Sequence, residues 1–309
     1  MGVKSALFFS LALTMGVLYL STHTQAKAQD IVVIKSHDIE PFNQALAGFV
    51  SACNQTITEY DLGGSAKGSK KILKSIQAGK PKLILALGLL AAQVAQEQVR
   101  DIPVVFFMVP NPYKYGLKGA NMAGISLDIP ADQQFAVYKT LVPSLHTLGV
   151  IYDPEKTGPM VTQADAMAAQ AGLKLLASPV TSYKDVPAAL RNMIGKIDAL
   201  WMVPDDTVMT PDSFKFLLVE AFENNLPFLT ISDIFVEVGA LASLTPDYAD
   251  LGRQGCQLAQ AIASGRLSLT EVNVVPPAKI NLAINLKTAS KIGLQLPSEI
   301  VQSAAKVYR

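Results

Sequence analysis

The sequence predicts an α/β fold of two lobes, each a parallel sheet with helices on both faces. Short β-rich runs alternate with helical stretches from residue 30 onward, which is typical of such sheets. Several runs are apolar throughout, as expected for strands covered on both faces. The alternation also occurs twice, because KPKLILALG, helix, DIPVVFFMV in the first half resembles KIDALWMVPD, helix, NLPFLTIS in the second. The repetition indicates two sheets.

The first half is predicted to hold five strands. They are the runs IVVIKS (31–36), ITEYDL (57–62), KLILALG (82–88), PVVFFMV (103–109) and AGISL (123–127). Helices are predicted between them at 41–53, 68–77 and 90–99. In the first of these helices Phe42, Ala45, Leu46, Phe49 and Val50 share one face, which indicates a helix packed on a sheet.

The second half repeats the order. Strands are predicted at 147–153, 174–180, 198–205, 227–232 and 240–245, and helices at 132–141, 161–171, 186–194 and 213–224. The tail follows with a helix at 251–264, an extended stretch at 273–286, and helices near Lys287 and Ser298. This tail is long enough to recross between the halves. We therefore predict lobe 1 at 29–128 plus about 246–278, and lobe 2 at 129–245 plus about 279–309.

The N-terminus is typical of a secretory signal peptide. Lys4 precedes an apolar run of 15 residues, ALFFSLALTMGVLYL, which is shorter than the roughly 20 residues that span a bilayer. A small-x-small site, Ala26-Lys27-Ala28, follows it. We predict that residues 1–28 are cleaved after Ala28 and that the mature protein is periplasmic or otherwise exported. An uncleaved membrane anchor is the alternative.

Composition and charge exclude several classes of protein. The chain has 26 basic and 25 acidic side chains among 309 residues, so it has no basic excess for binding nucleic acid. Half of its residues are apolar, which is unlike a disordered chain. Its cysteines are Cys53 and Cys256, both in predicted helices. Export would permit a disulfide between them. Separate buried thiols, which are common on such helix faces, are favoured over the disulfide, and a catalytic thiol is favoured least.

Polar and aromatic side chains follow many of the predicted strands. In open parallel sheets, ligands bind outside the carboxyl ends of the strands. If the two lobes face each other, these groups converge on one cleft, which suits a small organic ligand. Among these groups, Asn111 and Asp205 are the strongest candidates for polar contacts. The predicted ligand-binding residues are Ser36, His37, Gly88, Asn111, Tyr152, Asp205, Asp206, Thr207, Ser232, Asp247 and Tyr248.

Each candidate also has a purely structural interpretation. Asp38 and Asp206 are typical N-caps of the helices that follow them. Asn111 and Asp153 each precede a proline, which is typical of turns. Trp201 lies inside an apolar strand, where a place in the core is favoured over a place in the site.

The sequence offers little of the chemistry that enzymes need. The histidines that remain after cleavage, His37 and His146, are too few and too far apart for a zinc site of His and Cys ligands. Neither a G-x-S-x-G elbow nor a G-x-x-x-x-G-K-[ST] loop occurs. Ser36, His37 and Asp38 resemble a triad fragment, but adjacent side chains on a loop point in different directions. The sequence favours binding without metal or cofactor, and acid–base chemistry at Asp205-Asp206 is the enzymatic alternative.

Five segments resemble one known family. They are DIPVVFFMVPNP…GL…NMAGISL, LVPSLHTLGVIYDP, KIDALWMVPDDTVMTP, GALASLTPDYADLGRQG and INLKTASKIGLQLP, in this order. The sequence resembles the ABC transporter substrate-binding family of the tryptophan/tyrosine type over almost the whole mature chain. The resemblance implies a two-lobed type I periplasmic-binding-protein-like fold, with three crossings between lobes that close on a ligand.

The family's site residues are matched only in part. Members that bind aromatic amino acids carry a small hydroxyl residue after strand three, where this chain has Gly88-Leu89-Leu90. They also carry an acidic-x-Asn-Ser stretch, where this chain has DPEKTGP (153–159). Asp205-Asp206-Thr207 and Asp247-Tyr248 fit the family pattern. The resemblance therefore predicts the fold but does not name the ligand.

The resemblance also implies a function and its partners. We expect a non-enzymatic solute-binding protein that captures a small molecule and delivers it to an ABC permease in the membrane. The alternative with the same fold is a periplasmic protein that presents the ligand-bound form to a membrane sensor. In either case no nucleic acid is expected as a partner.

Overall fold

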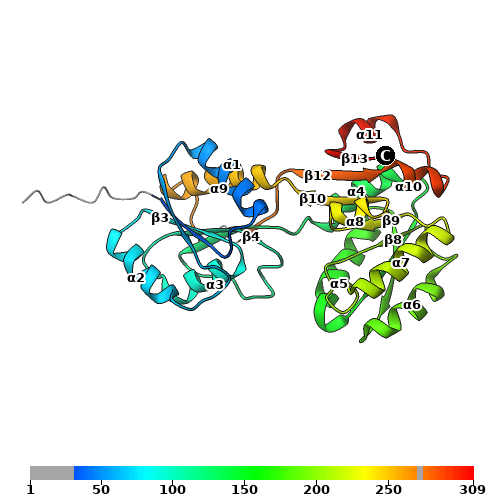
Figure 1. The fold of residues 1–309 in the computed structure, drawn as a ribbon, viewed down its shortest axis with the longest axis horizontal. Coiled ribbons are helices and arrows are strands. Elements are labelled where there is room, and N and C mark those ends of the chain that lie inside the picture. Colours follow the sequence, from blue (N-terminus) through cyan, green and yellow to red (C-terminus); the bar gives the residue numbers. More distant parts are fainter. Residues whose placement is uncertain (1–30, 270–273) are drawn as a thin grey trace, which may run out of the picture.

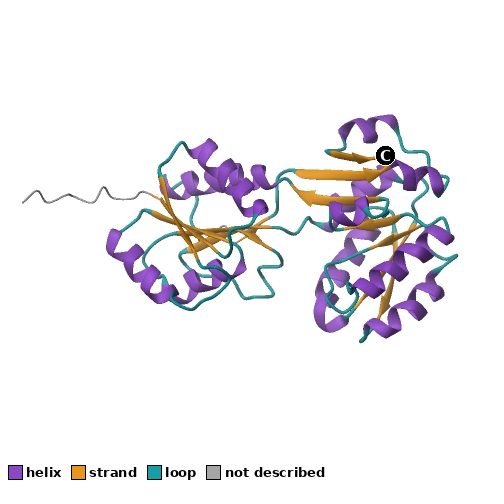
Figure 2. Ribbon diagram, viewed as in Figure 1, coloured by secondary structure: helices purple, strands orange, loops and turns teal. Residues whose placement is uncertain are grey.

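The computed structural model describes residues 31–269 and 274–309, and these residues form two lobes side by side (Figure 1). Each lobe has one sheet with helices on both faces (Figure 2). We call the part built on the first sheet lobe 1 and the part built on the second sheet lobe 2. The predicted fold class is thereby confirmed. The signal peptide predicted at residues 1–28 lies outside the described residues. Among the described residues, no helix is long and apolar enough to cross a bilayer.

The sheet of lobe 1 is parallel throughout, in the order β11-β5-β4-β3-β1-β2. Its helices α1 and α9 cover one face, where Phe49 and Leu251 pack on Val33. Helices α2 and α3 cover the other face, where Leu73 packs with Ile34. The strands are β1 Ile31–Lys35, β2 Ile57–Asp61, β3 Leu83–Leu87, β4 Val104–Val109, β5 Met122–Ser126 and β11 Val274–Val275, and the helices are α1 Glu40–Cys53, α2 Ser69–Gly79, α3 Leu89–Gln98 and α9 Tyr248–Ala263.

The sheet of lobe 2 has the order β13-β12-β10-β9-β8-β6-β7. Its pairs are parallel except for β12 with β10, which is antiparallel; β13 is parallel to β12, so both of these strands run opposite to the rest of the sheet. The strands are β6 Thr147–Tyr152, β7 Lys174–Pro179, β8 Ala199–Trp201, β9 Phe228–Thr230, β10 Ala242–Pro246, β12 Ile280–Asn285 and β13 Lys306–Tyr308. The helices are α4 Ala131–Leu141, α5 Pro154–Gln170, α6 Val186–Met193, α7 Pro211–Glu223, α8 Asp233–Glu237, α10 Leu286–Lys291 and α11 Ser298–Ser303, with a 3-10 turn at Tyr183–Asp185.

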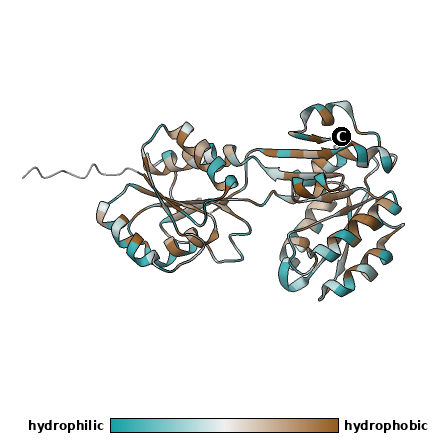
Figure 3. Ribbon diagram, viewed as in Figure 1, coloured by the Kyte–Doolittle hydropathy of each residue, from teal (hydrophilic) through white to brown (hydrophobic). Residues whose placement is uncertain are grey.

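The two faces of the second sheet are packed separately. Phe135 and Val161, from α4 and α5, belong to one apolar cluster. Leu190 and Leu217, from α6 and α7, belong to the other. Apolar residues concentrate in the strands of both sheets (Figure 3). This is the arrangement that continuous apolar strands require, since both of their faces are covered.

Among the described residues the chain crosses between the lobes three times (Figure 1). It leaves lobe 1 between β5 and α4, returns between β10 and α9, and crosses again between β11 and β12. These crossings run side by side at the junction of the lobes. The residue boundaries predicted for the two lobes stay a prediction.

Helix α5 begins at Pro154, seven residues before the predicted start at residue 161. Gly158 and Pro159 lie inside this helix, and both residue types weaken the helical pattern there. Two N-terminal signals override this weakening, because the Asp153 side chain accepts a hydrogen bond from Glu155 N and a proline at the first helical position fits without strain. The prediction also missed α8 and β13, which are short elements without a periodic apolar pattern.

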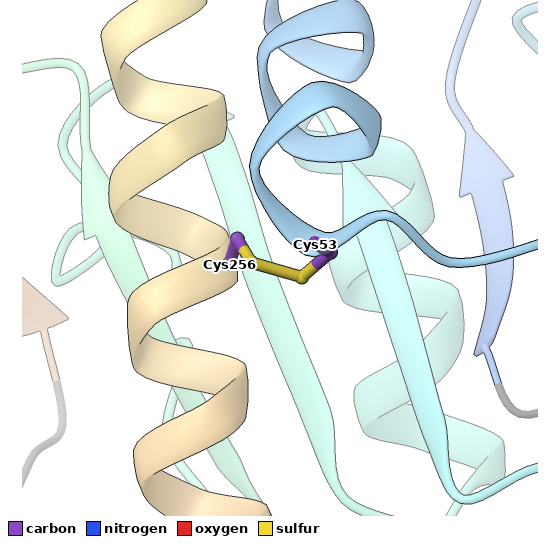
Figure 4. The surroundings of a disulfide bond; sticks show 2 residues. All are labelled: Cys53 and Cys256. Atoms are coloured by element: carbon purple, nitrogen blue, oxygen red, sulfur yellow. A yellow bond between two sulfur atoms is a disulfide. The ribbon is translucent and has the colours of Figure 1, made fainter.

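A disulfide joins Cys53, at the end of α1, to Cys256, in the middle of α9 (Figure 4). The two Cα atoms lie 5.6 Å apart, and 203 residues of sequence separate the cysteines. The sequence left open whether the two cysteines form a disulfide or remain separate thiols. In the folded chain they form the disulfide. They do so because α9, after the chain has returned from lobe 2, packs along α1.

Candidate functional site

Two cavities lie at the junction of the lobes, with volumes of about 440 and 230 Å³. We call them the larger and the smaller interlobe cavity. Asp128, Ile129, Gln134, Met160 and Trp201 line both of them. Most of the remaining lining is apolar. The cavities therefore combine an apolar wall with a few polar groups, which suits a small organic molecule.

The walls come from both lobes and from all three crossings. The larger cavity takes residues from the loop after β4 in lobe 1, from α5 in lobe 2 and from the crossing at Val274, Val275 and Pro276. The smaller cavity takes residues from the crossings near Leu127 and Pro246, together with the end of β8. A rotation of one lobe against the other would change the shape of both cavities.

Two of the predicted site residues line these cavities. Asn111 lines the larger one and Tyr248 the smaller one. Asn111 has a left-handed backbone with φ of 43°, a conformation that asparagine tolerates better than most residues. Its N–H donates to Asp128 Oδ2 at 2.7 Å, and its Oδ1 accepts from Lys114 N at 3.2 Å. Asn111 therefore shapes the turn and also reaches the cavity wall.

Tyr248 is the first residue of α9, directly after the second crossing. It is half-buried, and burial raises the pKa of its hydroxyl, to which the negative charge of Asp233 adds. Its neighbour Asp247 caps α9 by accepting from Asp250 N at 3.0 Å, and its other oxygen is 2.8 Å from Lys279 Nζ. Asp247 thus acts as a cap and an ion-pair partner beside the cavity.

Three predicted residues lie in the loops that follow β1 and β3 of lobe 1. Ser36 is buried, and its Oγ accepts from Ala91 N at 2.9 Å, in the first turn of α3. Gly88 precedes α3 with φ of 86°, and a Cβ there would lie 2.7 Å from Ser36 Oγ. His37 is exposed and packs against Gly64. None of the three lines either interlobe cavity in this structure.

Asp205 is fully buried, and both oxygens of its carboxylate accept hydrogen bonds from the chain itself. Oδ2 accepts from Thr157 Oγ1 at 2.6 Å and from Asp153 N at 2.8 Å. Oδ1 accepts from the N–H groups of Thr207 and Val208 at 3.0 and 3.2 Å. The two bonds to Oδ2 connect the segment after β6 to the loop after β8, and the two bonds to Oδ1 lie within that loop. In this structure Asp205 faces the protein and does not line the cavities.

Asp153 and Thr207 complete this network. Thr207 Oγ1 donates to Asp153 Oδ2 at 2.7 Å. This bond, followed by the one from Glu155 N, lowers the pKa of Asp153. Asp206 is exposed beside them. The matched Asp-x-Thr segment is therefore a loop scaffold in this structure.

The two remaining predicted residues lie in lobe 2. Tyr152 is half-buried and packs on the apolar cluster under α4 and α5. Ser232 caps the short helix α8 by accepting from Ile234 N at 3.4 Å. The assignment of these residues, and of the loop residues above, to a ligand stays a prediction.

Sequence reasoning missed two polar residues of the cavity walls. Asp128 follows β5, a strand whose carboxyl end was left out of the candidates although it leads into lobe 2. Gln134 lies on α4 and accepts hydrogen bonds from Trp201 Nε1 at 3.0 Å and Tyr138 Oη at 3.1 Å. The rule that selects the ends of parallel strands could have found Asp128. No sequence signal marks Gln134.

The described residues show no group of three or more His, Cys, Asp or Glu side chains placed to hold a metal ion. The Oγ of Ser36 accepts from Ala91 N, and within the part of the chain that the structure describes no hydrogen bond joins it to His37. Asp205 is occupied by its four donors. The geometry therefore offers a binding cavity and no assembled acid–base pair.

Similarities to known proteins agree with this geometry. A family model described as ABC transporter substrate binding protein matches residues 51–308. A tyrosine-binding protein of Clostridioides difficile (strain R20291) is 26% identical over 236 residues, which are 74% of this chain and 67% of that protein.

Solved structures are similar over most of the chain. The ligand-free, open structure of a substrate binding protein with adhesive properties from Clostridium difficile is 25% identical, with a TM-score of 0.75 over 90% of this chain and 98% of that one. A domain from Streptococcus pneumonia in complex with L-Trp is 24% identical, with a TM-score of 0.58 over 90% of this chain and 99% of that one. Both share the two-lobed fold.

Proposed function

Because the chain belongs to the ABC transporter substrate-binding protein family, whose members are substrate-binding proteins and not enzymes, we propose that it is the exported solute-binding protein of an ABC-type importer. It captures a small organic ligand between its lobes and delivers it to a membrane permease. The observation that carries this proposal is the pair of interlobe cavities, which both lobes and all three crossings line.

Capture is proposed to work by closure of the two lobes. A ligand that contacts both lobes stabilises the closed form and shifts an open–closed equilibrium towards it. The comparison of folds supports an open form here, because the TM-score is 0.75 against a ligand-free, open structure and 0.58 against an L-Trp complex. The three crossings supply the hinge.

Aromatic amino acids and their analogues are the first ligands to test. The relatives named above bind tyrosine or were solved with L-Trp. The apolar lining around Trp201 and Met160 suits an aromatic body. The chain departs from the family pattern at Gly88-Leu89-Leu90 and at 153–159, so a ligand that differs from an aromatic amino acid in its polar groups is included in the test.

A ligand screen tests the proposal directly. A ligand at about 100 times its dissociation constant stabilises the folded state by roughly 2.7 kcal/mol, which raises the melting temperature. Trp201 is the only tryptophan of the chain and lines both cavities, so its fluorescence reports on binding there. Calorimetry replaces fluorescence for indole ligands. Stoichiometric binding without product supports the proposal, and chemical turnover of the ligand contradicts it.

A pair of asparagine variants tests the place of binding. Asn111→Gly removes a side chain from the cavity wall but keeps the left-handed backbone with φ of 43°. Loss of its contact to a ligand should weaken binding by about 1–3 kcal/mol. Asn225→Gly is the matched control. Asn225 also has a positive φ, of 52°, and it lies in lobe 2 away from both interlobe cavities. Equal affinities of the two variants would contradict a site at the junction.

The partner is tested by capture from membranes. Ligand-loaded protein should retain a permease and its ATPase subunit from detergent-solubilised membranes, and ligand-free protein should retain less. Retention of a sensor kinase in place of the permease would contradict the importer role and favour the sensing alternative.

A further inference from the structure

Asp128 is the carboxylate at the centre of the candidate site. It lies in the first crossing between β5 and α4 and lines both interlobe cavities. It is half-buried. A charged group in such a position is costly unless it has partners, so the atoms around its carboxylate indicate what the site takes.

Within the part of the chain that the structure describes, one oxygen of this carboxylate accepts hydrogen bonds and the other does not. Asp128 Oδ2 accepts from Ser126 Oγ and from Asn111 N, both at 2.7 Å. Asp128 N donates in turn to Ser126 Oγ at 2.9 Å, which fixes the side chain against the end of β5. Within residues 31–269 and 274–309, no donor contacts Oδ1. Among the described residues, one oxygen is thus held rigidly while the other has no donor.

The charge of Asp128 also has no counterion in the cavities. No Lys, Arg or His is among the described residues that line either of them. The other ionisable groups in the lining are the phenols of Tyr113 and Tyr248, and neither is a base. Burial raises the pKa of Asp128, and the bonds from Ser126 and Asn111 only partly offset this. A cation bound at Oδ1 would remove this penalty.

We infer that Asp128 Oδ1 binds a positively charged amine of the ligand, so that the substrate class is an organic amine with an apolar or aromatic body. This inference rests on the proposed function and adds to it the group by which the ligand is selected. The apolar walls at Ile129 and Met160 contact the body. An organic acid without an amine meets a carboxylate with no compensating base and is rejected.

Matched ligand pairs test the inference. Tyramine and 3-(4-hydroxyphenyl)propionate share one skeleton, as do tryptamine and indole-3-propionate, and tyrosine and tryptophan carry both charged groups. Thermal shift and calorimetry should show binding of the members with an amine and none of the acids alone. Equal binding of the acids would overturn the amine inference and leave solute binding intact. Absence of binding by every member would overturn the inference, while binding of an unrelated solute in the wider screen would still support the proposed function.

A substitution locates the amine at Asp128. Asp128→Asn retains an oxygen to accept from Ser126 and Asn111 and places an NH2 group, which cannot accept, at the position of Oδ1. The affinity for the amine ligand should fall about 10- to 100-fold, the range for a hydrogen bond to a charged group. Asp132→Asn is the control. Asp132 lies in the first turn of α4, shortly after Asp128, and its carboxylate is exposed and does not line the cavities. An unchanged affinity of folded Asp128→Asn would overturn the assignment.

Discussion

Asp205 and Asp206 are adjacent carboxylates with opposite surroundings. Asp205 has no exposed surface and accepts four hydrogen bonds, whereas Asp206 is exposed. From the sequence alone they form one acidic pair with a possible catalytic role. In the fold Asp205 is a structural residue and Asp206 is not, because donors from the segments after two different strands surround the carboxylate of Asp205.

We predict that Asp205→Ala lowers the free energy of unfolding by about 3 kcal/mol or more, because it leaves the N–H of Asp153 and the Oγ–H of Thr157 buried without acceptors. Asp206→Ala should change it by no more than about 0.5 kcal/mol. Urea unfolding of both variants measures the difference. Similar midpoints for both variants would show that the buried network does not stabilise the fold.

Asp247 makes the free energy of unfolding depend on pH in the acidic range. Burial alone would raise its pKa, but hydrogen bonds from Lys279 and Asp250 N, with the charges of Lys279 and Arg253, outweigh it and lower the pKa. A group whose folded pKa lies below the unfolded value of 3.8 stabilises the fold above that value. This contribution is lost as the pH falls below about 4 towards the folded pKa.

We therefore predict that Asp247→Asn flattens the loss of stability on acidification below about pH 4. The reason is that asparagine keeps an acceptor for Asp250 N but has no charge to lose. Thermal unfolding of the wild type and the variant at a series of pH values measures it. Parallel curves for the two proteins would rule out the contribution of Asp247.

Helices α1 and α9 are the elements on which lobe 1 depends most. They belong to different passes of the chain, since α9 returns after lobe 2 is complete. Their backbones approach closely at two glycines, because a Cβ on Gly48 would meet Ala249 O and a Cβ on Gly252 would meet Ala45 O. Cys53 and Cys256 then cross-link the pair.

We predict that Gly252→Ala destabilises the protein by about 1–3 kcal/mol, since a Cβ at 1.9 Å from a backbone oxygen forces the two helices apart. Gly79→Ala is the matched control, because it is also helical and has nothing within 4 Å of its added Cβ. The control should be neutral or slightly stabilising, as alanine favours helix over glycine. Calorimetric melting of both variants checks the prediction, and equal melting temperatures would contradict it.

We predict that the double variant Cys53→Ser/Cys256→Ser unfolds with about 2–5 kcal/mol less free energy than the oxidised protein. The large effect follows from the 203 residues that the bridge closes off in the unfolded chain. Urea unfolding with and without reductant provides the measurement. Reductant should weaken the wild type and leave the double variant unchanged, and a reductant effect on both would point to another cause.

At the scale of the whole molecule, the separation of the lobes is the main feature. Each lobe has its own sheet and its own apolar clusters, and the three crossings connect them. Exposed apolar side chains occur on both lobes. Examples are Tyr113, in the loop after β4 of lobe 1, and Ile234, in helix α8 of lobe 2. Of these two, Tyr113 lines the larger interlobe cavity.

We predict that a ligand found in the screen reduces the radius of gyration, because bound ligand holds the lobes together. Small-angle X-ray scattering of the free and saturated protein measures the change. Asp128→Asn at the same ligand concentration should keep the larger radius. If the saturated wild type is as extended as the free protein, capture does not involve closure.

The sequence predicted the two sheets well because their strands are continuous apolar runs. The predicted strand 147–153 corresponds to β6, Thr147–Tyr152, and the predicted strand 103–109 to β4, Val104–Val109. Elements without such a pattern were missed, such as β13, which is held by pairing with β12 and by Lys306 at 3.0 Å from Asp233. Local pattern is sufficient where burial on both faces determines the strand.

The candidate site was less predictable than the fold. Asn111 and Tyr248 line the cavities, while Asp205 is turned into the protein and Asp128 was overlooked. The side chains at strand ends were recognisable, but not their direction. Whether a carboxylate faces a cavity depends on where donors from other loops lie, and those donors are distant in sequence.

The sequence by itself determined the alternation of strands and helices, the two-fold repetition and the likeness to a family, since these depend on composition and order along the chain. Only the tertiary structure decided that Cys53 pairs with Cys256, that Asp205 is enclosed by its own loops, and that Asp128 presents one oxygen to a cavity between the lobes. The physical reason is the same in each case. These properties arise from groups in different segments of the chain, which approach one another only in the folded protein.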